Sequence, residues 1–200
     1  NLSVKRRYIA VKVVLIGDSI RGGYQKLVAA KLKGRAEVWW PADNCRHIVW
    51  TLDHFKEWIE EQKPDIVHAN NGIHDAAFDV YGDGEPQILL DQYRLGLKRL
   101  LARLKNRLPE TRLIWATTTP RYWKLPDKPR KEWPVWPHIA RYNDAAIEIM
   151  RDAGIPVNDL NRVVFNRGVA RCICNDGCHM TPLGSKVLAE AVVKAIRAVM

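Results

Sequence analysis

The sequence predicts an α/β protein: a three-layer α/β/α sandwich with a five-stranded, parallel, flavodoxin-like sheet. Two observations lead to this fold class. Short apolar runs, typical of buried strands, alternate along the chain with longer amphipathic stretches that are typical of helices. Apolar residues make up 47% of the 200 and charged residues 27%, values that are ordinary for one domain with a full core. We therefore expect a single domain over residues 1–200.

Five strands are expected in this sheet. The first, 11–16 (Val-Lys-Val-Val-Leu-Ile), is a buried-strand run that ends at Gly17. The others are shorter and are bounded by turn residues. The expected strands span 11–16, 37–40, 66–70, 113–117 and 156–157.

Five helices are expected between and after these strands. In the third, leucines follow a helical period and basic residues occupy the opposite face, which indicates a solvated surface. The last should begin at Pro182, because Thr181 can cap a helix and proline suits its first position. The expected helices lie near 20–33, 52–62, 87–107, 138–153 and 182–199.

A proline-rich insertion at 121–138 separates the fourth strand from the next helix and contains Trp123, Trp133 and Trp136. It is too long for a simple connection and suggests a lid or binding loop. Either these tryptophans pack on one another to hold the loop, or they bind substrate, as a stacking platform for sugar rings or an apolar slot for an acyl chain.

The formal charge of +10 restricts the partners. Basic residues of the insertion, such as Lys124 and Lys128, could face an acidic substrate. No recognised nucleic-acid module occurs, and no apolar stretch approaches a membrane span. We expect a small-molecule or polysaccharide ester as partner, with neither nucleic acid nor a membrane span; the oligomeric state stays open.

The four cysteines give no metal-binding pattern. Cys172, Cys174 and Cys178 crowd beside His179, but their spacing matches no usual zinc set, so neither a metal nor a cofactor is expected. An exported protein would oxidise a pair, Cys174 with Cys178 or Cys45 with Cys178, and a cytosolic one would not. Residues 1–8 are too polar for a signal peptide, and whether a leader preceded Asn1 stays open; export is favoured over the cytoplasm.

Two short segments supply the groups of a nucleophilic mechanism. Ser19 follows the first strand at the turn into a helix, where the positive helix terminus favours a developing alkoxide. Asp176 and His179 precede the last helix, three residues apart, so the carboxylate can reach the imidazole. A serine hydroxyl needs such an imidazole to take its proton. The loops after the strands should gather these groups at one edge of the sheet, together with Asn44, residues 70–75 and Thr119, which could line the pocket.

With these residues the chain resembles the SGNH (GDSL-type) hydrolase superfamily over essentially its whole length. The first block is 17–20 (Gly-Asp-Ser-Ile), the third resembles 72–75 (Gly-Ile-His-Asp), and the fifth is 176–179 (Asp-Gly-Cys-His). The resemblance implies that Ser19 is the nucleophile, His179 the general base and Asp176 the residue that orients it. It also implies an oxyanion hole made by the N–H of Ser19, a backbone N–H of the second block and a side-chain donor of the third.

The oxyanion hole departs from the superfamily pattern in two places. The second block, 41–46, lacks the usual glycine, so Cys45 or Arg46 must donate, and Arg46 is favoured. In the third block His74 stands where asparagine is usual; a neutral ring can donate, its tautomer fixed by Asp75 or a backbone carbonyl, and Asn70 is the alternative donor.

The sequence therefore predicts a serine esterase that forms an acyl-enzyme on Ser19. Small acyl esters, with O-acetylated carbohydrate favoured, are the expected substrates. One alternative is a lipid-directed carboxylesterase or lysophospholipase that uses the tryptophans as an acyl groove. The other is a carbohydrate-binding protein of the same fold with little turnover.

Overall fold

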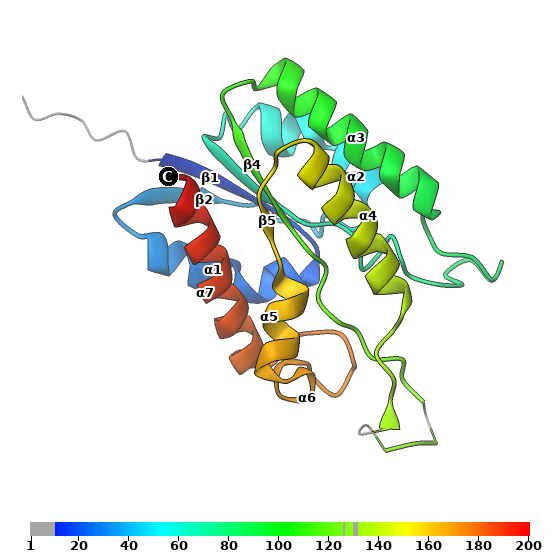
Figure 1. Cartoon of the computed structure of the whole chain (residues 1–200). Helices are drawn as coiled ribbons and strands as arrows, with labels where there is room; N and C mark the ends of the chain where they lie inside the picture. The colour runs from blue at the N-terminus through cyan, green and yellow to red at the C-terminus, as the bar shows by residue number, and fades with distance from the viewer. Residues whose placement is uncertain (1–10, 126, 130–131) are drawn as a thin grey trace, which may run out of the picture.

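A five-stranded parallel sheet forms the centre of the chain, in a computed structural model that describes residues 11–125, 127–129 and 132–200 (Figure 1). The strands lie in the order β2-β1-β3-β4-β5, and all neighbouring pairs are parallel. This is the flavodoxin-like order, so the predicted fold class is confirmed. The strands are β1 Val11–Ile16, β2 Ala36–Trp39, β3 Ile66–Ala69, β4 Arg112–Ala116 and β5 Val157–Asn158.

Helices cover both faces of this sheet. Helices α1 and α7 pack together on one face, and α3 packs with α2 and α4 on the other (Figure 1). The helical segments are α1 Ser19–Leu32, α2 Ile48–Asp53, the π-helical turn η1 Lys56–Glu60, α3 Leu90–Arg107, α4 His138–Asp152, α5 Leu160–Arg167, α6 Val169–Cys172 and α7 Pro182–Val199.

The sequence prediction was wrong in two places. The single helix expected at 52–62 is two pieces, α2 and η1, and the first begins at Ile48. Helices α5 and α6 were not predicted. Helix α5 begins because the Asp159 side chain accepts a hydrogen bond from the N–H of Arg162. Gly168, with φ 99°, then turns the chain into α6.

The centre of the sheet is buried on both faces. In β1 the residues from Val13 to Ile16 are fully buried, and in β3 all four residues are buried. A strand covered on both faces needs a nearly continuous apolar run, which is why β1 was visible in the sequence.

The loops after β3 and β4 meet at the carboxyl edge of the sheet. Gly72 lies after β3 with φ 154°, and a Cβ atom built on it would lie 2.1 Å from the Thr118 Oγ1 of the loop after β4. Only glycine allows this close approach. The contact brings the loops after β3 and β4, which are expected to carry part of the site, into one place.

None of the helices in the described ranges combines the length and hydropathy of a membrane span.

Candidate active site

Ser19 is the first residue of α1, directly after the strand-to-helix turn. The carboxylate of Asp18 caps the helix by accepting the N–H of Ile20 at 2.8 Å. The Ser19 hydroxyl therefore lies at a helix N-terminus, where partial positive charge stabilises an alkoxide.

His179 and Asp176 form a hydrogen-bonded row with this serine. His179 Nε2 lies 3.0 Å from Ser19 Oγ, and His179 Nδ1 lies 2.6 Å from Asp176 Oδ2. The structure thus brings together the three side chains that the sequence singled out. About half of each of the His179 and Asp176 side chains is exposed, so a substrate can approach.

Backbone hydrogen bonds hold the segment that carries Asp176 and His179. The Cys174 N–H donates to the His179 carbonyl at 2.7 Å, and the Thr181 N–H donates to the Cys172 carbonyl at 2.8 Å. Thr181 also caps α7, because its hydroxyl accepts the N–H of Gly184 at 3.1 Å. The predicted start of this helix is confirmed.

The surroundings of the Asp176 carboxylate favour its ionised form. Burial acts to raise its pKa, but the N–H of Cys178 and the ring and N–H of His179 outweigh burial, and the pKa is lowered. The two backbone N–H groups lie 2.9 and 3.0 Å from Asp176 Oδ1. An ionised carboxylate on Nδ1 leaves Nε2 free to accept a proton from a hydroxyl.

The second-block N–H groups are already bonded within the protein. Arg46, with φ 47°, donates its N–H to Asn44 Oδ1 at 2.8 Å. Cys45 donates its N–H to the Gly17 carbonyl at 3.2 Å. The predicted Arg46 donor is therefore not free in this conformation, because the Asn44 side chain has closed a local turn on it.

The two candidate side chains for the third oxyanion-hole donor, Asn70 and His74, differ in whether an N–H group is left for a substrate. Asn70 donates both amide hydrogens, to the Ala116 carbonyl at 2.8 Å and to Thr118 Oγ1 at 3.2 Å, so no N–H remains for a substrate. His74 is half-buried, and burial is the main cause that lowers its pKa. The charge of Asp18 opposes this effect, while Arg121 and Arg46 add to it. A neutral His74 ring keeps one N–H to donate.

Asp75 does not fix the His74 tautomer as expected. Its Oδ1 accepts the N–H of Ile48 at 2.9 Å, and its Oδ2, fully buried, has no hydrogen-bond partner among the described residues. Burial raises the pKa of Asp75 to about 7. Asp75 therefore anchors the start of α2.

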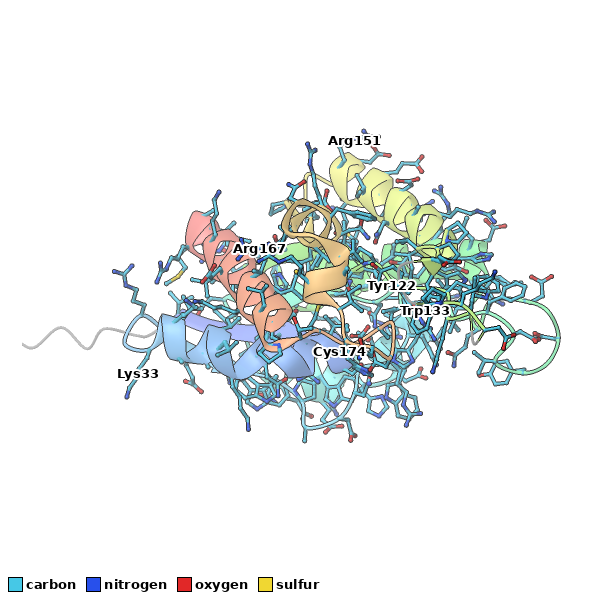
Figure 2. All side chains as sticks on the ribbon, turned by 90° about the horizontal axis from the view of Figure 1, so that it is seen from below. Lys33, Tyr122, Trp133, Arg151, Arg167 and Cys174 are labelled. Atoms are coloured by element: carbon cyan, nitrogen blue, oxygen red, sulfur yellow. The ribbon has the colours of Figure 1, made fainter. Side chains whose placement is uncertain are left out.

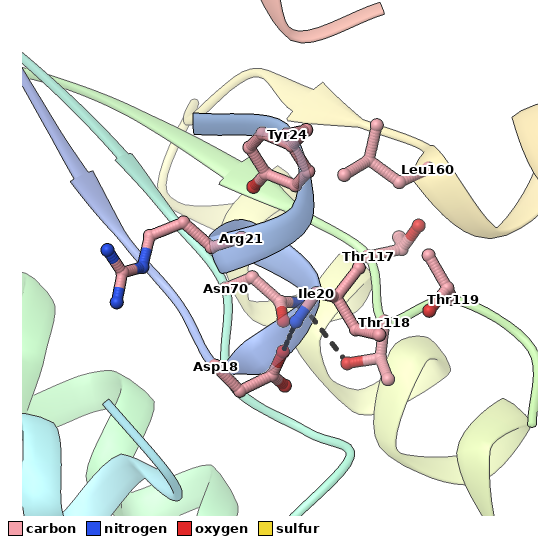
Figure 3. A pocket seen from close by; sticks show the side chains of 9 residues that line it. All are labelled: Asp18, Ile20, Arg21, Tyr24, Asn70, Thr117, Thr118, Thr119 and Leu160. Atoms are coloured by element: carbon pink, nitrogen blue, oxygen red, sulfur yellow. Dashed lines mark hydrogen bonds between the residues drawn. The ribbon is translucent and has the colours of Figure 1, made fainter. Parts of the chain in front are cut away.

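A small polar pocket lies beneath the start of α1 (Figure 3). Its volume of about 10 Å³ suits one water molecule and is too small for a substrate. Thr119, predicted to bind substrate, lies here: it is 3% exposed and its hydroxyl has no partner in the described part of the chain. Asp18, Asn70 and Thr118 line the same pocket, as Figure 3 shows.

The aromatic insertion contributes to a larger cavity, of about 520 Å³, beside Asp176. Trp123, 44% exposed, and Trp136, 7% exposed, both line it. Trp133 does not: its indole N–H donates to the carbonyls of Leu125 and Lys128, both at 2.9 Å. Its ring lies edge-on to Tyr122, with centroids 6.5 Å apart, and the two are neighbours in Figure 2. Trp133 therefore holds the loop through Tyr122 and two carbonyls. The expected packing of tryptophans on one another is found between Trp123 and Trp136, whose rings lie edge-on with centroids 6.1 Å apart, and both of these also line the cavity.

The four cysteines are free thiols, and Cys45 is fully buried. No group of three or more histidine, cysteine or acidic side chains in the described ranges is arranged to hold a metal ion.

One residue near the site was missed by the sequence analysis. Arg21 is buried; its Nε donates to the Gly17 carbonyl at 3.0 Å, and its guanidinium donates to the carbonyls of Pro41 and Asp43 at 3.1 and 2.7 Å. It fixes the second-block loop against α1. The available signal was an arginine on the apolar face of α1, beside Ile20 and Tyr24.

A parallel α/β/α sandwich with a serine, a histidine and a carboxylate hydrogen-bonded in a row at the sheet edge is the arrangement expected of a hydrolase. Residues 15–187 match the model of the GDSL-like lipase/acylhydrolase family, so the chain belongs to this family. It is a carboxylic ester hydrolase.

Relatives agree with this assignment. A GDSL esterase/lipase of Arabidopsis thaliana is 25% identical over 93% of this chain and 86% of its own. Among solved structures, the acetyl xylan esterase AlAXEase superposes with a TM-score of 0.75 at 18% identity, covering 93% of this chain and all of that one. Axe2, an acetylxylan esterase from Geobacillus stearothermophilus, gives 0.69 at 18% identity, covering 94% and 95%. At these identities the structures show a shared fold.

Proposed function

We propose that this enzyme is a serine esterase that hydrolyses small acyl esters, chiefly acetyl esters of carbohydrates, through an acyl-enzyme on Ser19. The observation that carries the proposal is the pair of hydrogen bonds in a row, 3.0 Å from Ser19 Oγ to His179 Nε2 and 2.6 Å from His179 Nδ1 to Asp176 Oδ2.

The reaction proceeds in two half-reactions. Ser19 Oγ attacks the ester carbonyl while His179 Nε2 takes the hydroxyl proton, and the same proton then passes to the leaving alcohol. Water next attacks the acyl-enzyme with His179 as general base, which releases the acid and restores Ser19. Asp176 holds the ring and stabilises the imidazolium that forms in each half.

The oxyanion of each tetrahedral intermediate is stabilised by the N–H of Ser19 and by the neutral ring of His74. Asn70 is unsuited to this role because both its amide hydrogens are bonded within the protein. Arg46 can contribute only after its N–H leaves the Asn44 side chain, from which it is now 2.8 Å.

The preference for carbohydrate rests on the cavity beside Asp176. Trp123, 44% exposed, offers a broad face on which a sugar ring can stack, and the buried Trp136 packs edge-on to it and supports it. Two neighbours of the same fold, AlAXEase and Axe2, are named acetylxylan esterases, which is consistent with this choice.

A lipid-directed esterase is the second candidate. Phe78 and Val80, which line the same cavity, are 37% and 50% exposed, and an acyl chain could cover them.

Acetyl release from acetylated xylan and pectin, compared with hydrolysis of aryl esters of rising chain length, tests the proposal. We expect acetyl release from polysaccharide and a steep fall in aryl ester hydrolysis beyond short chains. Activity that rises with chain length favours the lipid-directed candidate. A protein that binds these glycans and hydrolyses none of the esters contradicts the proposal and favours the binding-protein alternative.

A further inference from the structure

The cavity beside Asp176 has one wall that carries unpaired positive charge. Arg121, Trp123 and Lys124 come from the segment after β4, and Trp136 supports them. Phe78 and Val80, which follow β3, also line the cavity. The cavity is thus lined by aromatic and apolar surface, by these two cations and by the carboxylates of Asp79 and Asp176.

Neither cation is neutralised by a carboxylate. In the described ranges no acidic side chain forms an ion pair with Arg121 or Lys124. The Arg121 guanidinium lies over the Trp136 ring, 4.6 Å from its centroid, and Lys124 Nζ lies 6.0 Å from the Trp133 centroid. These ring contacts orient the cations and leave their N–H donors free.

The two carboxylates that line the cavity are engaged elsewhere. Asp176 accepts hydrogen bonds from His179 Nδ1 and from two backbone N–H groups. Asp79 accepts the N–H of Gly84 at 2.8 Å, within its own turn. A half-buried arginine with no carboxylate partner is well placed to take one from a ligand, because its planar fork matches that group bidentately.

The cavity also lies close to the reacting groups. Asp176 belongs both to the cavity wall and to the hydrogen-bonded row that reaches Ser19. The charge of Arg121 is near enough to His74 to lower the pKa of that ring. A sugar held in the cavity can therefore present an adjacent acyl ester to Ser19.

We infer that Arg121 and Lys124 bind an anionic group of the substrate, a carboxylate in first place, so that the enzyme prefers acylated sugars that carry one, as uronic acids do. This inference rests on the proposed function and adds the substrate class to it. A neutral acylated sugar stacks on Trp123 without the charged contact.

The test compares acetate release from two substrates: acetylated oligogalacturonate, and the same oligosaccharide with its carboxylates methyl-esterified, which removes the charge and adds one methyl group per sugar. We expect kcat/KM to be about tenfold or more higher for the anionic form, since a charge-assisted hydrogen bond contributes about that factor. The preference should shrink as salt is raised. Equal kcat/KM values for the two forms would overturn the inference.

Variants assign the preference to particular side chains. Arg121→Gln and Lys124→Gln should each lower the ratio of the two kcat/KM values. Arg121→Lys, which keeps the cation over Trp136, should retain part of it and controls for disturbance of the loop. Lys128→Gln is the matched control: it removes the same charge from the same loop, at an exposed side chain outside the cavity, and should keep the wild-type ratio. An equal fall in the Lys128→Gln variant would mean that bulk charge is responsible, against the inference.

Direct binding separates this inference from the proposed function. Calorimetry with oligogalacturonate that carries no acetyl groups should show binding to the wild-type protein and weaker binding to Arg121→Gln. A sulfated oligosaccharide of the same length distinguishes a planar carboxylate from a tetrahedral anion; tighter binding of the sulfated chain contradicts the choice of carboxylate. Failure to hydrolyse any ester refutes the proposed function, whereas absence of oligogalacturonate binding refutes the inference alone.

Discussion

On one side of Ser19, the His179 and Asp176 side chains form a continuous row of hydrogen bonds, whereas on the other side the N–H groups of Cys45 and Arg46 donate within the protein. The proposed proton-transfer side is thus hydrogen-bonded throughout without substrate. The side that should stabilise the oxyanion is only partly so, with His74 as its available side-chain donor. The comparison teaches that the two halves of one candidate site can differ in how much they are preorganised.

The largest effect should come from the residue that both sides share. Ser19→Ala removes the nucleophile and should lower kcat for aryl acetates by on the order of a millionfold. The fold should survive, because the Asp18 cap of α1 is retained. Rates of aryl acetate hydrolysis measure the fall in kcat, thermal melting checks the fold, and labelling with a fluorophosphonate probe checks the nucleophile. A folded variant with wild-type turnover would show that another group is the nucleophile.

The proton-transfer side should behave as a unit. His179→Ala should cost nearly as much as the loss of Ser19, and Asp176→Asn less, on the order of ten thousandfold. Adding either change to Ser19→Ala should cost little more. Measured kcat values for the single and double variants show whether the losses add. Fully additive losses would argue that the three side chains do not share one mechanism.

His74 tests the oxyanion side. His74→Ala should lower kcat by about a hundred- to a thousandfold with little change in KM, because the donor acts mainly in the transition state. His74→Asn should restore part of the rate by supplying an amide N–H. If both variants melt earlier and keep the wild-type rate per folded molecule, His74 is structural.

The smallest effect concerns Asp75, which follows His74 in the chain and accepts the N–H of Ile48 at the start of α2. Its folded-state pKa of about 7 lies above the ordinary value of 3.8, so the folded protein binds the extra proton. Its ionisation should therefore cost stability as pH rises from about 4 to 7, with the full cost present above that range. Asp75→Asn removes this cost while an oxygen can still accept the Ile48 N–H. Melting temperatures at pH 5 and pH 8 should differ less in the variant than in the wild type; equal differences would contradict the raised pKa.

The side with His179 and Asp176 could be predicted from the sequence, whereas the side with Arg46 could not. Ser19, Asp176 and His179 could be placed together because local features position each one: a buried strand before Ser19, and a three-residue spacing and the Thr181 cap beside His179. The state of Arg46 could not be foreseen. It depends on a turn closed by Asn44, and on Arg21, whose bonds to Pro41 and Asp43 span about twenty residues.

The helices, strands and tryptophans also show that features set by local sequence could be predicted and features set by distant contacts could not. Strand β1 was predicted from its nearly continuous apolar run. Helices α5 and α6 have only eight and four residues, which is too short for a helical period to be recognised in the sequence. Trp133 and Trp136 look alike in the sequence, and only the hydrogen bonds of the first indole to two loop carbonyls separate their roles.

The packing of α1 against α7 has a consequence for biosynthesis. Ser19 begins the first of these helices, and His179, 160 residues later, lies three residues before the start of the second. If these two groups act together as proposed, a nascent chain cannot turn over substrate until the 18 residues of α7 have left the ribosome and docked. Incomplete translation products and chains nicked within α7 should accordingly accumulate as inert protein rather than as hydrolases of altered selectivity.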